Sequence, residues 1–195
     1  MRKGMAKGYG KGYRNVISRD PLIHSQSAKG MKQPDSTFLD RIFPQPKPLK
    51  TVPKLNVSRY MGRWYDIAHL PAWFQSGLRD VTAEYEKKKG YIKVKNAGVD
   101  EEGMKKLAYA KAYPVDSTNA RLKVDFGFIF DGDYHVIYVD KGYNNAIVGT
   151  PDRNYLWILS RKPSISKSRL TELKSKAKSQ GFDIKELQKT KQSVR

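Results

Sequence analysis

Apolar and polar residues alternate along most of the chain after residue 62. In residues 80–87, Val81, Ala83 and Tyr85 occupy every second position, and acidic or hydroxyl side chains occupy most of the others. A period of two is the pattern of a strand with one buried face. Such segments, separated by short turn sequences, predict eight strands at 64–68, 80–87, 91–99, 105–115, 120–128, 134–140, 145–150 and 155–161.

Eight short strands joined by turns predict an all-β fold, an eight-stranded antiparallel up-and-down barrel, because closing the sheet removes both of its edges. A C-terminal α-helix should follow, since Ser166 is a suitable N-cap and Leu170, Leu173 and Ala177 recur on one face before a glycine. We expect this face to pack on the outside of the barrel. A helix that lies on a membrane surface or binds calmodulin is the alternative. Residues 182–189 would add a last edge strand.

The N-terminal part of the chain has a different composition. Residues 1–54 contain twelve Lys or Arg and three Asp, with four prolines between 44 and 53. Because this stretch has few apolar residues to bury, we predict a largely disordered basic extension. The alternative is an arm whose Lys-Gly-Tyr repeat binds nucleic acid or another anionic surface. The predicted organisation is an extension at 1–51, a barrel with its helix at 52–190, and a tail at 191–195.

The overall charge narrows the classes of partner. Lys and Arg number 38 against 19 Asp and Glu, a formal net charge of +19, which favours anionic partners. The chain has no cysteine, so disulfides, thiolate metal sites and a lipid-modified cysteine are excluded. No apolar run approaches the ~20 residues of a transmembrane helix, and no secretory signal peptide is visible. We therefore expect a cytoplasmic location or assembly into a larger particle.

Three short motifs resemble those of the lipocalins. Gly62 and Trp64 lie on the first predicted strand, Asp152 precedes the last one, and Arg161 ends it. The stretch 151–161 is particularly similar to the bacterial outer-membrane lipocalins, relatives of apolipoprotein D. The resemblance covers about residues 52–190 and implies a barrel that binds a small hydrophobic ligand. It also implies that Trp64 closes one end of the barrel, that Arg161 lies across its ring, and that Gly62 lets the chain pass close beneath.

If the apolar faces point inward, their alternation gives the lining of a ligand cavity. Small side chains between aromatic rings would leave room for one ligand. The alternative is that the rings fill the barrel. Phe74, beside Trp73 in a loop, should lie at the open end. Asp66 should face inward near the base; the resemblance implies a structural role for this acid, which would need a hydrogen-bond partner if buried. The predicted ligand-binding residues are Ala68, Phe74, Ala83, Tyr85, Val94, Asn96, Ala110, Ala112, Val124, Phe126, Val136, Tyr138, Ile147, Tyr155 and Trp157.

No catalytic or metal-binding motif is recognisable. His24, His69 and His135 have no serine or acid in a known arrangement, and metal-ligand spacings and phosphate-binding glycine loops are absent. We therefore expect no enzyme activity and no cofactor. The predicted function is binding, storage or transport of a small hydrophobic or amphipathic anionic ligand, such as a fatty acid or lysophospholipid. The alternative is an interaction protein whose extension binds nucleic acid or an anionic surface, with the barrel as scaffold.

Overall fold

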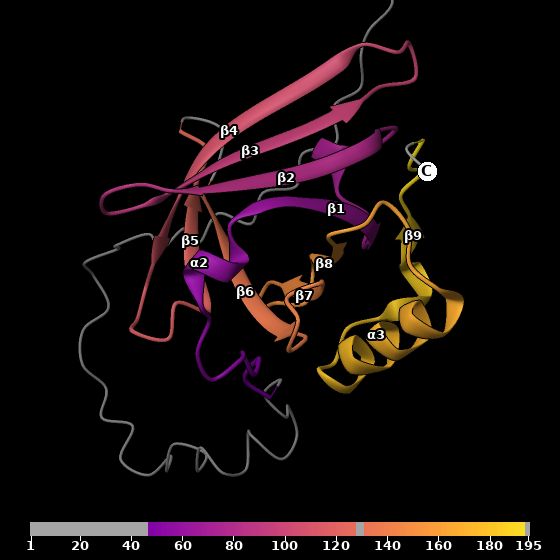
Figure 1. Ribbon diagram of the computed structural model, residues 1–195. Coiled ribbons are helices and arrows are strands. Elements are labelled where there is room, and N and C mark those ends of the chain that lie inside the picture. The colour runs from indigo at the N-terminus through magenta and orange to yellow at the C-terminus, as the bar shows by residue number, and fades with distance from the viewer. Residues whose placement is uncertain (1–46, 128–130, 194–195) are drawn as a thin grey trace, which may run out of the picture. The chain divides into compact units, whose positions relative to one another are not determined.

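The computed structural model describes residues 47–127 and 131–193, and these form a β-barrel with one long helix outside it (Figure 1). The elements, in chain order, are helix α2 (Val57–Tyr60), strand β1 (Gly62–His69), the 3-10 turn η1 (Trp73–Gln75), β2 (Arg79–Lys87), β3 (Ile92–Val99), β4 (Lys105–Pro114), β5 (Arg121–Asp125), β6 (Asp131–Val139), β7 (Asn145–Gly149), β8 (Leu156–Ser160), helix α3 (Lys167–Ser179), the 3-10 turn η2 (Ile184–Glu186) and β9 (Gln188–Lys189).

The sheet closes on itself. Each strand from β2 to β8 pairs with the next in antiparallel fashion, and β1 pairs with both β8 and β2. This arrangement confirms the predicted eight-stranded antiparallel up-and-down barrel. Closure leaves none of these eight strands with a free edge along its whole length.

Buried apolar side chains form two clusters, one on each side of the barrel wall. The interior cluster contains Trp64, Tyr85, Val94, Ala112 and Val148. The second cluster lies between the outer surface of β1, β7 and β8 and the helix α3. Strand β7 is therefore buried on both faces, because Ala146 and Val148 belong to the interior cluster while Ile147 belongs to the outer one.

Helix α3 packs on the outside of the barrel as predicted. The Ser166 hydroxyl accepts a hydrogen bond from the backbone N–H of Arg169 and so caps the first turn. Leu173 and Ala177 are fully buried against the barrel. Gly181, at φ +92°, follows the last turn, in a backbone region that other residues rarely adopt.

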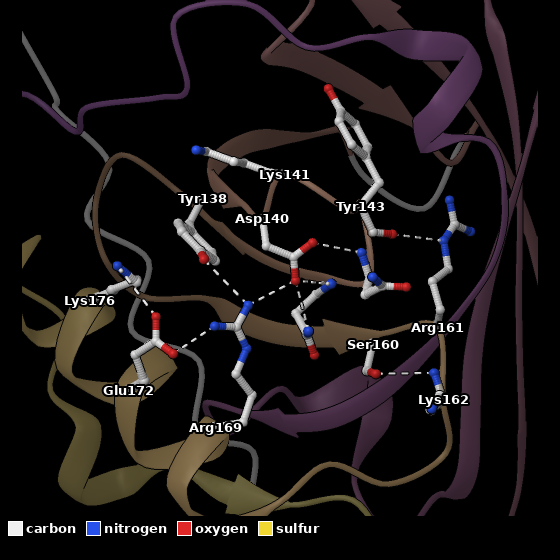
Figure 2. Close-up of polar contacts among 12 residues, drawn as sticks. Tyr138, Asp140, Lys141, Tyr143, Ser160, Arg161, Lys162, Arg169, Glu172 and Lys176 are labelled. Atoms are coloured by element: carbon white, nitrogen blue, oxygen red, sulfur yellow. Dashed lines mark hydrogen bonds and ion pairs between the residues drawn. The ribbon is translucent and has the colours of Figure 1, made fainter.

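A polar contact also holds α3 to the barrel. Figure 2 shows the Arg169 guanidinium between Tyr138, Asp140 and Glu172. Its nitrogens lie 2.8 Å from an Asp140 carboxylate oxygen and 2.6 Å from a Glu172 oxygen. Asp140 also accepts hydrogen bonds from the backbone of Asn144 and from Asn145. The β6–β7 turn and the start of the helix are thus joined through one carboxylate.

Two elements differ from the sequence prediction. Helix α2 was not expected; the Asn56 side chain caps it by accepting from the Arg59 N–H at 3.1 Å. The edge strand expected at 182–189 is reduced to β9, because Asp183 caps the intervening turn η2 instead. None of the helices in the described ranges is both long and apolar enough to cross a membrane.

The two ends of the described chain lie against the barrel. Leu49, assigned by sequence to the extension, packs on the outer cluster, and the Val52 N–H donates to the Val136 carbonyl. At the other end, the Gln192 side-chain amide donates to the carbonyls of Asp66 and Val81, at 2.8 and 2.9 Å. It bridges β1 and β2 beyond the point where their pairing stops. The prediction of disorder falls mainly on residues 1–46, which lie outside the described residues.

Candidate ligand-binding site

The base of the barrel is closed by Trp64 and Arg161. The Arg161 guanidinium lies 3.9 Å from the centre of the fully buried Trp64 ring. It also donates to the backbone carbonyls of Arg63 and Met61, each at 2.7 Å, while the Trp64 indole N–H donates to the Tyr60 carbonyl. The contact expected from the family motifs is therefore present. It seals the base and provides no binding surface.

Three tyrosines fill the interior just above this base. The Tyr134 hydroxyl lies 2.7 Å from that of Tyr60 and 2.8 Å from that of Tyr85. Burial raises the pKa of Tyr60 and Tyr134 well above the ordinary value, and it raises the pKa of Tyr85 to about 12. All three phenols are therefore neutral at physiological pH. In the lower half of the barrel, the alternative that aromatic rings fill the interior is correct.

Above the tyrosines, small side chains line the wall formed by β2, β3 and β4. Ala83, Asn96 and Ala108 are register partners across these strands, one row above Tyr85, Val94 and Ala110, which are buried. Asn96 and Ala83 are half-buried, and Ala108 is exposed. Because inward-facing residues of a closed barrel gain exposure only through its mouth, the upper half of the interior is open to solvent. Ala108 was missing from the predicted lining, although it alternates with Ala110 and Ala112.

Aromatic side chains gather at the mouth. Tyr155 and Trp157 stack with ring centres 5.9 Å apart, and the Phe74 ring lies 5.7 Å from Tyr155 and 6.4 Å from Trp157. The Trp157 indole N–H donates to the Gln75 side-chain oxygen at 3.1 Å. Phe74 comes from η1, whereas the other two rings flank the start of β8. The structure thus brings Phe74 together with two predicted site residues, Tyr155 and Trp157, that lie far from it in sequence.

Gln75 also joins the mouth loop to a buried acid. Its side-chain amide donates to the Asp66 carboxylate, and the His69 Nδ1 lies 2.9 Å from the same carboxylate oxygen, Oδ2. The other oxygen, Oδ1, is buried and has no hydrogen-bond partner among the described residues. Asp66 therefore has the structural partners that a buried carboxylate requires, together with one unused acceptor. Gln75 was not predicted, since an isolated glutamine in a loop gives no sequence signal.

Three residues predicted to face the interior lie outside it. Ala68, Tyr138 and Ile147 all pack in or against the cluster beneath α3. Register shifts after Asp66 in β1 and after Val136 in β6 reverse the alternation beyond those points. Ile147 was misassigned for a different reason, because both faces of β7 are apolar and alternation cannot distinguish them.

The remaining predicted residues belong to the barrel interior or its mouth. Val124, Val136 and Ala112 are buried in the interior cluster, and Phe126 packs against it. Asp152 lies in the turn before β8, where its carboxylate accepts from the Thr150 hydroxyl and the Asn154 N–H. Burial opposes ionisation of this acid, but these hydrogen bonds outweigh it and hold the pKa of Asp152 below the ordinary value. Its role is structural.

Two hollows in the surface lie outside the barrel interior. One, of about 240 Å³, lies on the outer face of β1, β2 and β3 beside Gln192. The other, of about 260 Å³, lies between the η1 loop and β9. Charged and amide side chains contribute much of both linings, and both hollows are open to solvent. Neither provides the apolar enclosure that a hydrophobic ligand needs.

The described histidines and acidic residues form no metal site. No group of three or more His, Asp or Glu in the ranges 47–127 and 131–193 is arranged to hold a metal ion. His135 lies on the outside of β6, where burial lowers its pKa although Asp133 opposes this. His69 contacts Asp66 and the Thr190 hydroxyl. His24 lies outside the described residues.

Comparison with known proteins identifies relatives that agree with the observed fold. A family model described as a lipocalin-like domain matches residues 55–192. The outer membrane lipoprotein Blc of Escherichia coli K12 is 41% identical over 142 residues, covering 71% of this chain and 80% of the relative. Apolipoprotein D of Macaca fascicularis is 32% identical over 146 residues, covering 69% and 76%. The family resemblance of the three sequence motifs is thus confirmed.

Solved structures support the fold independently. Insecticyanin from the tobacco hornworm Manduca sexta superposes with a TM-score of 0.62 at 21% sequence identity, over 75% of this chain and 85% of that one. At this identity the likeness concerns the architecture alone. It shows that the overall fold is one already seen in solved structures.

The same relatives correct the expected location. Several of the bacterial matches are named outer membrane lipoproteins, which points to association with a membrane and away from the cytoplasm or a larger particle. The expectation rested on the lack of a visible targeting feature. That lack was a poor guide, because contact with a membrane surface requires neither a spanning helix nor a cysteine.

Proposed function

The chain belongs to the lipocalin-like family, whose members bind small hydrophobic ligands, and from this premise we propose that it carries one such ligand in the upper half of its barrel. The ligand is bound and released without chemical change. The observation that carries the proposal is the difference between the two halves of the interior. Aromatic rings pack the base, whereas small side chains line the accessible wall above them.

The lining favours a slender, single-chain lipid such as a fatty acid or lysophospholipid. Ala83, Ala108 and Ala110 lie on one wall, and the stacked Tyr155 and Trp157 rings lie at the mouth. An acyl chain gains about 0.8 kcal/mol for each methylene group that it buries. Its polar end would stay at the rim, outside the apolar lining.

A cation is available at this rim. Lys106 precedes Ala108 by two positions on β4 and therefore continues the inward row toward the mouth. Its ammonium group lies 2.8 Å from the Asp100 carboxylate and is well exposed. Lys106 supports the choice of an amphipathic anionic ligand, whose head group would contact water and this ammonium together.

Enlarging a side chain in the open row tests the proposal. Ala108→Leu should abolish binding of a fluorescent fatty acid because the new side chain occupies the proposed space. The melting temperature should stay near that of the wild type, since Ala108 is exposed and nothing is overpacked. Both quantities are measurable on the same preparation, by fluorescence titration and by calorimetry.

The matched control lies two rows below on the same strand. Ala112 is fully buried against Val124 and Ile92, so Ala112→Leu should cost ~1–3 kcal/mol of stability through overpacking. Ala108→Leu that destabilises the fold as much as Ala112→Leu would show a packed upper half and contradict the proposal. Unchanged fatty-acid affinity in Ala108→Leu would contradict it as well.

A further inference from the structure

The outer surface of β3 and β4 is unusual for a strand face turned to solvent. Of the seven large hydrophobic side chains exposed in the described residues, five lie on β4 or beside its ends. They are Met104, Leu107, Tyr109, Tyr113 and Val115, with exposed fractions from 38% to 62%. The inward apolar positions along the middle of the strand are the alanines 108, 110 and 112, so the larger apolar side chains point away from the barrel interior.

Lysines interleave with these side chains. Strands β3 and β4 contain five lysines and no acidic residue. Lys93 lies opposite Lys111 in the register, and Lys95 lies opposite Tyr109. Among the ion pairs of the described residues, Lys106 pairs with Asp100, and no carboxylate lies within 4 Å of Lys93, Lys95, Lys105 or Lys111. On the neighbouring strand, Glu86 and Glu84 lie opposite Lys93 and Lys95, but these two acids pair with Lys88 and Arg63. The β3–β4 face, defined as Tyr91, Lys93, Lys95, Lys105, Leu107, Tyr109, Lys111 and Tyr113, therefore keeps an excess of positive charge.

We propose that the β3–β4 face docks on an anionic lipid bilayer. Tyrosine is suited to the boundary between head groups and acyl chains, because its ring is apolar and its hydroxyl is polar. Lysine places its alkyl chain along the apolar region and its ammonium among the phosphates. Leu107, on the outward row of β4, supplies an exposed aliphatic group that hydrocarbon would bury favourably.

The contacts within the face distinguish a bilayer from a nucleic acid. The Lys93 ammonium lies 5.9 Å from the centre of the Tyr109 ring, and the Lys111 ammonium lies 5.5 Å from that of Tyr91. An ammonium group thus already lies over two of the three tyrosine rings on which a base would stack. Leu107 and Val115 would gain nothing from a sugar-phosphate backbone. The aliphatic side chains therefore favour lipid.

The positive charge also argues against two protein partners. A second copy of the chain would bring lysine against lysine, since both copies would present the same face. The N-terminal residues of the chain itself are strongly basic, with twelve Lys or Arg against three Asp in residues 1–54. Anionic lipid has the complementary charge, and its attraction to a nearby lysine corresponds to about a fivefold gain in affinity.

The test uses the full chain and a single label. Because the protein has no native cysteine, Leu107→Cys carries an environment-sensitive fluorophore at one position, and Ser168→Cys on the outer surface of α3 is the matched control. Vesicles of phosphatidylcholine with about one quarter phosphatidylglycerol should shift the emission of the label at 107 to shorter wavelength. Vesicles of phosphatidylcholine alone should not, and the label at 168 should respond to neither.

Charge variants complete the test. In the Leu107→Cys chain, Lys93→Gln with Lys111→Gln should weaken vesicle binding about 25-fold, whereas Lys178→Gln with Lys185→Gln should change it little. A label at 107 that stays water-exposed while the protein sediments with vesicles would mean that the N-terminal residues alone bind, and would overturn the proposal. An emission shift of the label at 107 that appears without vesicles and increases with protein concentration would also overturn the proposal. An emission shift produced by an oligonucleotide and not by lipid would overturn it as well.

Discussion

Arg161 is a charged residue that the barrel holds without a carboxylate. Its guanidinium donates to the carbonyl oxygens of four residues between 59 and 63, namely Arg59, Tyr60, Met61 and Arg63, and it covers the Trp64 ring. Burial lowers its pKa from the ordinary value, although an arginine stays protonated at any accessible pH. Gly62, at φ +87°, lies so close that a Cβ there would meet Arg161 Nη1 at 3.4 Å. The Arg161 side chain thus holds the base of the barrel closed through these contacts.

Truncation of this residue should therefore weaken the fold more than ligand binding. We expect Arg161→Ala to lower the free energy of unfolding by about 2–4 kcal/mol, from the loss of the ring contact and the charged hydrogen bonds. Arg161→Lys keeps the charge but loses the planar fork, so it should recover less than half of that loss. Urea unfolding measures both. A wild-type transition midpoint in Arg161→Ala would show that the seal is not stabilising.

The three interior tyrosines give the base a spectroscopic signature. Their pKa values are raised by burial, so the native state holds their protons at a pH where the unfolded chain releases them. Stability from this source is complete below pH 10, the ordinary tyrosine pKa, and is lost as the pH rises above it. Tyrosinate absorbance should therefore show three of the twelve tyrosines ionising only as the barrel unfolds. Tyr134→Phe should remove one of these three late-ionising groups. Ionisation of all twelve tyrosines before the barrel unfolds would show that the three are not buried.

At the scale of the element, the sequence pattern predicted strands and their inward faces correctly where only one face of the strand is buried. The alternation of Ala108, Ala110 and Ala112 gives both the strand and its inward face. The same alternation gave the wrong face for Tyr138 and Ala68. In each of these strands, one extra residue shifts the register, so that the following side chains point to the opposite side of the barrel wall. A register shift depends on the partner strand, so the sequence of one strand cannot reveal it.

The polar link to helix α3 should make its docking sensitive to acid. Burial alone would raise the pKa of Asp140, but hydrogen bonds from Asn145, Asn144 and Arg169 outweigh it and lower the pKa. A lowered pKa contributes stability that is complete above the ordinary value of 3.8 and is lost as the pH falls below it.

Asp140→Asn tests this link, because it keeps the shape of the side chain and removes its titration. We expect the variant to be less stable than the wild type at pH 7 and to approach it as the pH falls below 3.8. Amide exchange of α3 measures the local effect, and Glu172→Gln, on the exposed side of Arg169, is the control. A difference in stability between wild type and Asp140→Asn that stays constant across the acid range would contradict a stabilising role for ionised Asp140.

At the scale of the whole molecule, the net charge of +19 bears on ligand choice. In the proposed complex, a ligand carboxylate at the rim would contact one exposed cation, Lys106, in an interaction of up to about 1 kcal/mol. Palmitate should therefore bind about two- to fivefold more tightly than hexadecanol at low salt, and the ratio should approach one in about 1 M salt. Lys106→Gln should reduce the preference at low salt. Equal affinities for palmitate and hexadecanol at low salt would show that charge does not contribute to ligand specificity.

The position of Gln192 has a consequence for how the chain folds during synthesis. Strand β1 is made first, yet along its length it pairs with β8 and β9 as well as β2, and Gln192 joins Asp66 to Val81 across the remaining gap. The barrel wall is incomplete until β8, β9 and Gln192 have left the ribosome. Hairpins such as β3–β4 are able to form early, but closure has to wait for contacts between segments over a hundred residues apart. Closure of the barrel therefore follows the synthesis of β8 and Gln192, and the nascent chain exposes an unpaired β1 edge until then.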